Sequence, residues 1–96
     1  MTLNEITKRL TIGQLALDLH YANNITKALQ SEYWDKLHSY EEEHGDLIGR
    51  LTFDHPDHAG AIAATKDEYA AYKQAKREAY NIKRRLYYAC GRIANA

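Results

Sequence analysis

The sequence predicts an all-α fold, a three- or four-helix bundle dominated by an antiparallel helical hairpin. Only one proline and five glycines occur in 96 residues, and the helix-favouring residues alanine, leucine, lysine and glutamate are abundant. The last third of the chain, residues 65–93, carries an apolar stripe at helical spacing. This stripe consists of Tyr72, Ala75, Ala79, Ile82, Leu86, Ala89 and Ile93. A chain of this length holds one core, so we expect residues 1–96 to form a single helical domain.

The first helix is expected to begin at Thr2, because Thr2 and Glu5 have the spacing of a capping box. One side of this helix carries Leu3, Ile6, Leu10, Gly13, Leu17 and Tyr21. The opposite side carries Ile12, Leu15 and Leu19. Two interpretations fit this pattern: one central helix that is apolar all round, or a break at Thr11, which has capping-box spacing to Gln14. We favour two short helices that meet at Thr11.

A second helix is expected over residues 25–44. It follows Asn23 and Asn24, which favour a turn because their side chains compete for backbone hydrogen bonds and tolerate left-handed geometry. Its inner face consists of Ile25, Leu29, Tyr33, Leu37 and Tyr40, spaced three and four residues apart. Gly45 suits the position just past the end of a helix.

Four acidic residues gather at the end of this helix and define an acidic patch: Glu41, Glu42, Glu43 and Asp46. The C-terminal end of a helix is the negative end of its dipole, where each carboxylate is unfavourable by roughly a few tenths of a kcal/mol. The placement therefore indicates either a functional surface for a basic partner or a helix that frays before Glu43.

A connector over residues 46–60 leads to the last helix. Its apolar side chains predict that it packs against the helices; they are Leu47, Ile48, Leu51 and Phe53. Residues 59–64 are expected to form a short helical lead-in. Thr65 and Glu68 repeat the capping-box spacing, so the last helix either restarts at Thr65 or runs through.

The expected architecture pairs residues 25–44 with residues 65–93, because the first segment is acidic and the second basic. Exposed ion pairs contribute only about 0–1 kcal/mol each, so packing carries most of the stability. The predicted core consists of Leu3, Ile6, Leu10, Leu17, Tyr21, Ile25, Leu29, Leu37, Ile82, Leu86 and Ile93. A homodimer is also expected, because the last helix is long and aromatic residues are in surplus.

Composition and motifs argue against several classes of protein. Thirteen basic and thirteen acidic residues cancel, so no overall field attracts nucleic acid or a membrane. The sequence has no glycine-rich phosphate loop, nucleophile elbow or Walker-type lysine, so we expect no enzyme and no cofactor. No apolar run approaches the ~18 residues of a membrane span, and the N-terminus lacks the pattern of a signal peptide. We therefore expect a cytoplasmic protein.

Two groups of reactive side chains have simple structural explanations. His55 and His58 lie among carboxylates in residues 54–58, which are the residue types of a metal site. The same residue types are common where a helix begins, so we expect a polar capping turn and no metal. Cys90 is the only cysteine, which excludes an intramolecular disulfide, and its place beside the apolar stripe predicts a buried, inert thiol.

The best candidate site is a row of tyrosines and cations on the last helix, which we call the Tyr/Lys stripe. It consists of Tyr69, Lys73, Lys76, Tyr80, Lys83, Arg84 and Tyr87. Tyrosine offers a large, stiff contact area and is enriched at interface hot spots, and neighbouring cations add orientation and cation–π contacts. The same combination can stack bases and hold phosphates. Alternatively, the tyrosines pack on the N-terminal helices with their hydroxyls at the rim.

Residues 10–19 resemble the first helix of a helix-turn-helix, including an alanine at the crowded helix crossing. The resemblance covers residues 10–29 and departs from the motif at two positions. His20 stands where the motif has a turn glycine, and Ile25 comes one position early. The residues at the reading positions are nearly uncharged; they are Ala22, Asn23, Asn24, Thr26 and Lys27. The resemblance implies a small DNA-binding regulator, whose reading positions usually carry arginine or lysine.

These observations predict a non-catalytic protein–protein interaction module. It would act as an adaptor or inhibitor that occludes a surface of a larger complex, including one that handles nucleic acid. The Tyr/Lys stripe would supply anchors, and the acidic patch would face a basic partner. The alternative is a small nucleic-acid-binding regulator that uses the helix-turn-helix at 10–29 or the basic C-terminal helix.

Overall fold

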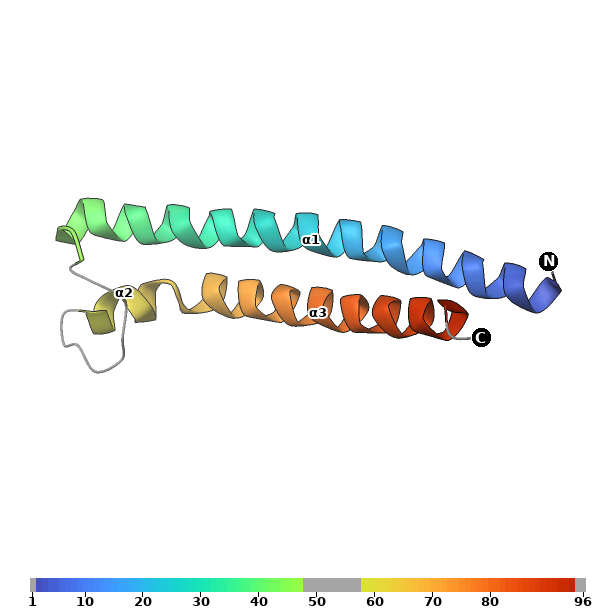
Figure 1. Ribbon diagram of the computed structural model, residues 1–96. Coiled ribbons are helices and arrows are strands. Elements are labelled where there is room, and N and C mark those ends of the chain that lie inside the picture. The colour runs from blue at the N-terminus through green and yellow to red at the C-terminus, as the bar shows by residue number, and fades with distance from the viewer. Residues whose placement is uncertain (1, 48–57, 95–96) are drawn as a thin grey trace. The chain divides into compact units, whose positions relative to one another are not determined.

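The computed structural model describes residues 2–47 and 58–94 of the chain. These residues form three helices: α1 (Leu3–His44), α2 (Ala59–Ala64) and α3 (Lys66–Ala94) (Figure 1). The described ranges contain no β-strand, so the predicted all-α class is confirmed. The finer prediction of a three- or four-helix bundle is not shown, because α2 has only six residues, less than two helical turns.

Helix α1 is continuous, so two predicted interruptions are wrong. The hydroxyl of Thr11 donates a hydrogen bond to the carbonyl oxygen of Thr7 at 3.0 Å and does not cap a new helix. Thr26, just beyond the predicted Asn-Asn turn, donates in the same way to the carbonyl of Ala22 at 2.8 Å. Such bonds to the residue four positions back satisfy a threonine hydroxyl inside a helix. The helix-turn-helix at residues 10–29 is also wrong, because these residues lie within one helix.

Both ends of α1 follow the sequence prediction. The hydroxyl of Thr2 accepts a hydrogen bond from the backbone N–H of Glu5 at 3.2 Å, which is one half of a capping box. At the other end, Gly45 has a φ of 94° and donates its N–H to the carbonyl of Glu41 at 2.7 Å. Only glycine adopts this left-handed geometry without strain. Because α1 extends to His44, fraying before Glu43 does not explain the acidic patch.

The described helices group into two compact units. The terminal unit combines Met1–Thr26 with Ala75–Ala96, and the middle unit comprises Lys27–Gln74. Each unit therefore contains one part of α1 and one part of α3. We describe the two units separately below.

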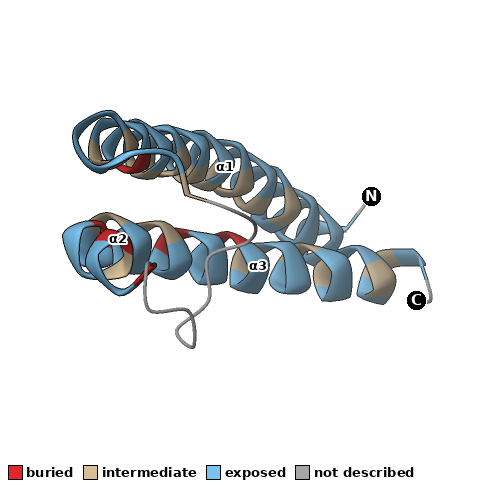
Figure 2. Cartoon of the chain, turned by 90° about the vertical axis from the view of Figure 1, so that its left-hand side faces the viewer, coloured by how far each residue is buried: buried red, intermediate tan, exposed pale blue. Residues whose placement is uncertain are grey.

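In the terminal unit, the predicted apolar face of α3 is confirmed. Ala75 and Ala79 are buried, and Ile82, Leu86, Ala89 and Ile93 are half-buried. The face of α1 that carries Ile12, Leu15 and Leu19 is half-buried as well. Figure 2 shows exposed residues along the opposite side of α1. The small core of this unit therefore lies on one face of each helix.

The predicted core is wrong for α1 of the terminal unit. The exposed fractions of its predicted core residues are Leu3 79%, Ile6 40%, Leu10 69%, Leu17 52%, Tyr21 60% and Ile25 57%. Among the remaining predicted core residues, Leu37 is buried, and Leu29, Ile82, Leu86 and Ile93 are half-buried. The reason is that α1 does not break. One straight helix keeps two opposite apolar faces, and only one of them meets α3.

In the middle unit, the core lies around the junction of α2 and α3. Leu37, His58, Ala61 and Thr65 are all at most 4% exposed. Thr65 donates both its hydroxyl, at 2.8 Å, and its backbone N–H, at 3.1 Å, to the carbonyl of Ala61. Helix α3 therefore restarts after Thr65, which was one of two predicted alternatives. The predicted contacts of Ile48, Leu51 and Phe53 lie outside the described residues.

Candidate interaction site

A pocket in the middle unit brings together aromatic side chains from α1 and α3. Tyr33 and Trp34 come from α1, and Tyr69 and Tyr72 come from the first turns of α3. We call it the aromatic pocket. Its volume is about 740 Å³, within the range of roughly 300–1,000 Å³ that is typical of ligand pockets. Its other lining residues are Gln30, Leu37, Glu41, Leu47, Ala59, Ile62, Ala63, Thr65 and Lys66.

Tyr33 lies at the centre of the aromatic cluster and contacts the three other rings. Its ring centroid lies 5.3 Å from that of Tyr69, 5.5 Å from that of Trp34 and 6.5 Å from that of Tyr72. The pair with Trp34 is edge-to-face and the pair with Tyr72 is stacked. Both arrangements are favourable for aromatic quadrupoles. The rings therefore hold one another in place and present a preformed wall.

Burial raises the pKa of the Tyr33 hydroxyl, and the neighbouring Tyr69 raises it further. Both causes disfavour a charged phenolate. The Tyr33 side chain itself is half-buried. Trp34, in contrast, remains 47% exposed and can be reached by a partner.

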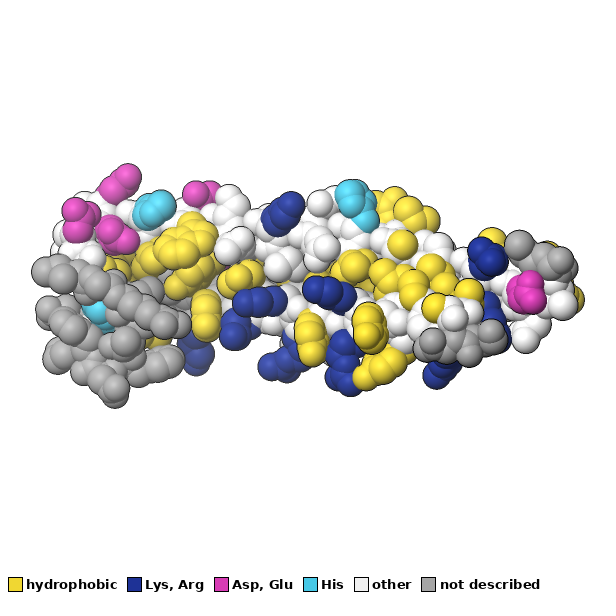
Figure 3. All heavy atoms as spheres, viewed as in Figure 1, with side chains coloured by type: hydrophobic (Ala, Val, Ile, Leu, Met, Phe, Trp, Pro, Cys, Tyr) yellow, Lys and Arg dark blue, Asp and Glu magenta, His cyan; other side chains and the backbone are white. Residues whose placement is uncertain are grey.

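The acidic patch adjoins the aromatic pocket. Glu41 is half-buried and lines the pocket itself, whereas Glu42, Glu43 and Asp46 are exposed. Figure 3 shows acidic side chains gathered at the connector end of α1. Lys66 also lines the pocket, from the start of α3. The surface therefore combines an apolar cavity with several carboxylates and one cation.

The Tyr/Lys stripe is divided between the two units. In the middle unit, Tyr69 belongs to the aromatic pocket, and the ammonium of Lys73 lies 5.9 Å from the centroid of its ring. This part agrees best with the alternative in which a tyrosine packs on an N-terminal helix, since Tyr69 contacts Tyr33. Lys73 itself is exposed.

In the terminal unit, the tyrosines of the stripe do not pack into a core. Tyr80 is 60% exposed and Tyr87 is 76% exposed. The guanidinium carbon of Arg84 lies 6.0 Å from the centroid of the Tyr80 ring, at the limit of a cation–π contact. Lys76 and Lys83 are exposed as well. The structure therefore brings Tyr80 and Arg84 together on an accessible surface.

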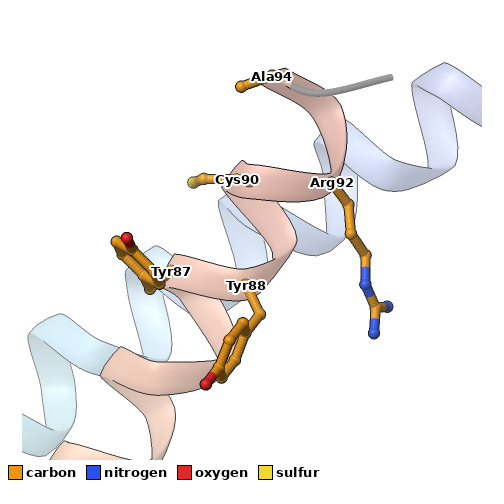
Figure 4. Close-up of a pocket in the computed structure, with 6 residues that line it drawn as sticks. Tyr87, Tyr88, Cys90, Arg92 and Ala94 are labelled. Atoms are coloured by element: carbon orange, nitrogen blue, oxygen red, sulfur yellow. The ribbon is translucent and has the colours of Figure 1, made fainter.

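A second hollow lies near the end of α3, lined by Tyr87, Tyr88, Cys90, Gly91, Arg92 and Ala94. Figure 4 shows that Tyr87 and Cys90 project to one side of the helix, whereas Tyr88 and Arg92 project to another. Cys90 is exposed, so the predicted buried thiol is wrong. The helical angle of Cys90 places it just past the edge of the apolar face, and α1 does not cover it.

Sequence analysis missed most of the aromatic pocket. Tyr33 was assigned to an inner helix face, which was the available signal. Sequence alone did not show that the Tyr33 ring meets Tyr69 and Tyr72, because no local pattern sets the register between α1 and α3. Leu47 was expected to pack against the helices, and it lines the pocket together with Ile62.

The described residues contain no group of three or more His, Cys, Asp or Glu side chains that could hold a metal ion. His58 is buried, while Asp54, His55 and Asp57 lie outside the described residues. In the described ranges, no helix combines the length and the apolar character that crossing a membrane requires. The cytoplasmic location remains a prediction.

Comparison with other proteins gives no family assignment. No protein-family model matches the chain, and neither a curated protein nor a solved structure matches it significantly.

Proposed function

We propose that this chain is a non-catalytic protein–protein interaction module, an adaptor or inhibitor that occludes a surface of a larger complex. The observation that supports this proposal is the aromatic pocket beside the acidic patch. Together they suit a basic segment of a partner protein that inserts one apolar or aromatic side chain. Candidate partners include proteins that handle nucleic acid, because such proteins expose basic segments.

In the proposed mechanism, the aromatic pocket supplies most of the affinity and the acidic patch orients the partner. Aromatic anchors in well-packed pockets carry most of the energy of protein interfaces, and Trp34 and Tyr69 would supply one side of that contact. Exposed charges mainly steer the approach of a partner and select a partner surface of opposite charge. Glu42, Glu43 and Asp46 would therefore speed the association of a basic segment, and Glu41 would meet a cation at the pocket wall.

The proposal is tested by capture of partners from cell lysate on the immobilised chain. Replacement of Trp34 and Tyr69 by alanine should remove a partner that the wild-type chain retains, without loss of helicity by circular dichroism. Tyr88→Ala is a matched control, because Tyr88 is an exposed aromatic residue of the other unit. Equal capture by all three proteins would exclude the pocket as the binding site.

The terminal unit offers a second contact surface at Tyr80, Lys83, Arg84 and Tyr87. In the proposed module this surface would contact an acidic or aromatic region of the same partner. Tyr80→Ala combined with Lys83→Ala should abolish capture if this surface carries an anchor. Tyr88→Ala combined with Arg77→Ala also removes one tyrosine and one cation, both outside the stripe, and serves as the control.

The alternative function, nucleic-acid binding, rests on the exposed pair of Tyr80 and Arg84. An exposed ring beside a guanidinium can stack on a base while the cation contacts a phosphate. Fluorescence anisotropy of labelled single- and double-stranded DNA and RNA, measured at two salt concentrations, tests this. Binding that weakens steeply with salt would favour this alternative and make Lys83, Arg84 and Arg85 the first residues to replace. An absence of binding at low salt would exclude it.

A further inference from the structure

An exposed apolar stripe runs along α1 within the terminal unit. It consists of Leu3, Ile6, Leu10, Leu17, Tyr21 and Ile25, and we call it the outer stripe. Each of these side chains is at least 40% exposed. Single exposed apolar residues are ordinary, but six of them along one face of a helix indicate an interaction surface.

The spacing of the outer stripe is regular once Gln14 is included. From Leu3 to Ile25 the steps are three, four and four residues, and this series occurs twice. An 11-residue period corresponds to about 3.67 residues per turn, close to the 3.6 of an ideal helix, so the stripe drifts only slowly around α1. At about 1.5 Å per residue, it extends for roughly 33 Å along the helix. Gln14 is the one polar position within it.

The other face of the same segment is already occupied. Ile12, Leu15 and Leu19 are half-buried in the terminal unit. A helix with apolar residues on two opposite faces is typically covered on both. The described residues of this chain cover one of the two faces, so the outer stripe requires a second surface.

We propose that the outer stripe binds the outer stripe of a second copy of the chain, with the two helices antiparallel and a two-fold axis at Gln14. A two-fold contact requires that a surface complement itself. Counted from Gln14, apolar residues lie 4, 8 and 11 positions towards the N-terminus and 3, 7 and 11 positions towards the C-terminus. The reversed stripe therefore matches the original to within one residue.

The one-residue offsets favour this pairing further. With the axis at Gln14, Leu10 of one copy lies opposite Asp18 of the other, one residue beyond Leu17. The leucines of the two copies therefore interdigitate instead of meeting head on. Gln14 at the midpoint donates a hydrogen bond from Nε2 to Oδ1 of Asp18 at 2.8 Å. A single polar residue in an apolar seam is a known determinant of register.

Charge supports a second copy over a membrane surface. The chain has a formal net charge of zero, so two copies do not repel each other through their overall fields. A helix that lies on a membrane surface has one apolar face and a polar face rich in lysine or arginine. Here the face opposite the outer stripe is apolar and packed, and the charges between the faces are balanced: Glu5, Lys8, Arg9 and Asp18.

The first test is the mass of the chain in solution by sedimentation equilibrium under reducing conditions. The wild type should approach twice the 11.0 kDa of one chain as its concentration rises. Leu10→Glu combined with Leu17→Glu should remain monomeric, with unchanged helicity, because both side chains are exposed and glutamate favours helices. Ala16→Glu combined with Asn23→Glu adds the same charge at exposed positions outside the stripe and should still dimerise.

The second test is disulfide cross-linking in a Cys90→Ser background, which locates the axis. Helices that pack 8–10 Å apart bring facing Cα atoms to roughly 4–5 Å, close to the usual Cα separation in a disulfide. Gln14→Cys should therefore form a cross-linked dimer with itself. Leu3→Cys alone should not, but it should cross-link to Ile25→Cys when the two variants are mixed.

Three results would overturn the proposal. A wild-type chain that stays monomeric at every concentration would show that another protein, or nothing, covers the outer stripe. A dimer that the double glutamate variant preserves would place the contact elsewhere on the molecule. Efficient self-cross-linking of Leu3→Cys, as strong as that of Gln14→Cys, would show a parallel pair.

Discussion

At the scale of single residues, Gly60 leaves no room for a side chain beside Tyr40 in the middle unit. A Cβ atom at Gly60 would collide with the Tyr40 hydroxyl and lie 3.3 Å from its Cζ atom. The Tyr40 ring is itself stacked on the His44 ring, with the ring centroids 4.2 Å apart. The side chain of Tyr40 therefore has little freedom to move away.

We predict that Gly60→Ala destabilises the chain by about 1–3 kcal/mol, although alanine favours a helix more than glycine does. Gly91 is the control, because a Cβ atom there meets no atom within 4 Å. Gly91→Ala should stabilise the chain by up to about 1 kcal/mol. Urea unfolding monitored by circular dichroism measures both changes, and a gain for Gly60→Ala would contradict the close packing.

Tyr33 gives a prediction for alkaline pH. Its pKa is raised in the folded chain above the ordinary value of 10.0, first by burial and then by Tyr69. The unfolded chain therefore loses this proton at a lower pH than the folded chain does. The contribution of Tyr33 to stability is complete below pH 10.0 and declines as pH rises through its folded pKa.

The measurement is the midpoint of urea unfolding as a function of pH. The wild type should lose stability above about pH 10, and Tyr33→Phe should lose less, because phenylalanine carries no ionisable group. Tyr88→Phe is the control, since Tyr88 is exposed and outside the middle unit. A decline of the same size in Tyr33→Phe would assign the pH dependence to other groups.

At the scale of helices, the sequence predicted those ends and faces that depend on neighbouring residues alone. The cap at Thr2, the stop at Gly45 and the apolar face of α3 all follow from local spacing. The break at Thr11 was wrong because a threonine hydroxyl can bond forward as a cap or back into its own helix. Asn23 and Asn24 likewise favour a turn, but such a local preference is weak, and both residues lie inside α1.

Helix α1 can be tested for continuity at Asn23. Proline inside a helix removes a hydrogen bond and collides with the preceding turn, so Asn23→Pro should destabilise the chain by about 3 kcal/mol or more. Asn23→Ala should instead stabilise it by several tenths of a kcal/mol, roughly the difference in helix propensity. In a turn the two substitutions would have the opposite order, and chemical denaturation distinguishes these outcomes.

At the scale of the whole molecule, the candidate site was only partly predictable. The acidic patch and the tyrosines of α3 are visible in the sequence because each lies on one segment. The aromatic pocket joins Tyr33 and Trp34 to Tyr69 and Tyr72, residues more than thirty positions apart. No local pattern reports such a pairing, and the apolar faces of α1 fit more than one register.

Trp34 supplies a direct test of the proposed binding mode, because it is the only tryptophan and it lines the aromatic pocket. A basic partner that fills the pocket should shift its fluorescence to shorter wavelengths, since the indole ring is 47% exposed beforehand. Glu42→Lys combined with Glu43→Lys should weaken this binding and reduce its dependence on salt. A partner that binds without changing the fluorescence would occupy another surface.

The terminal unit joins the first part of the chain to the last, which has a consequence during synthesis. Ala75 is added to the growing chain 49 residues after Thr26. At typical synthesis rates of about 5–20 residues per second, this delay is roughly 2–10 seconds. During that time the face of the nascent α1 segment that carries Ile12, Leu15 and Leu19 has no α3 to pack against, and both apolar faces are exposed. Newly made chains should therefore depend on chaperones, or on a neighbouring copy, more than the finished protein does.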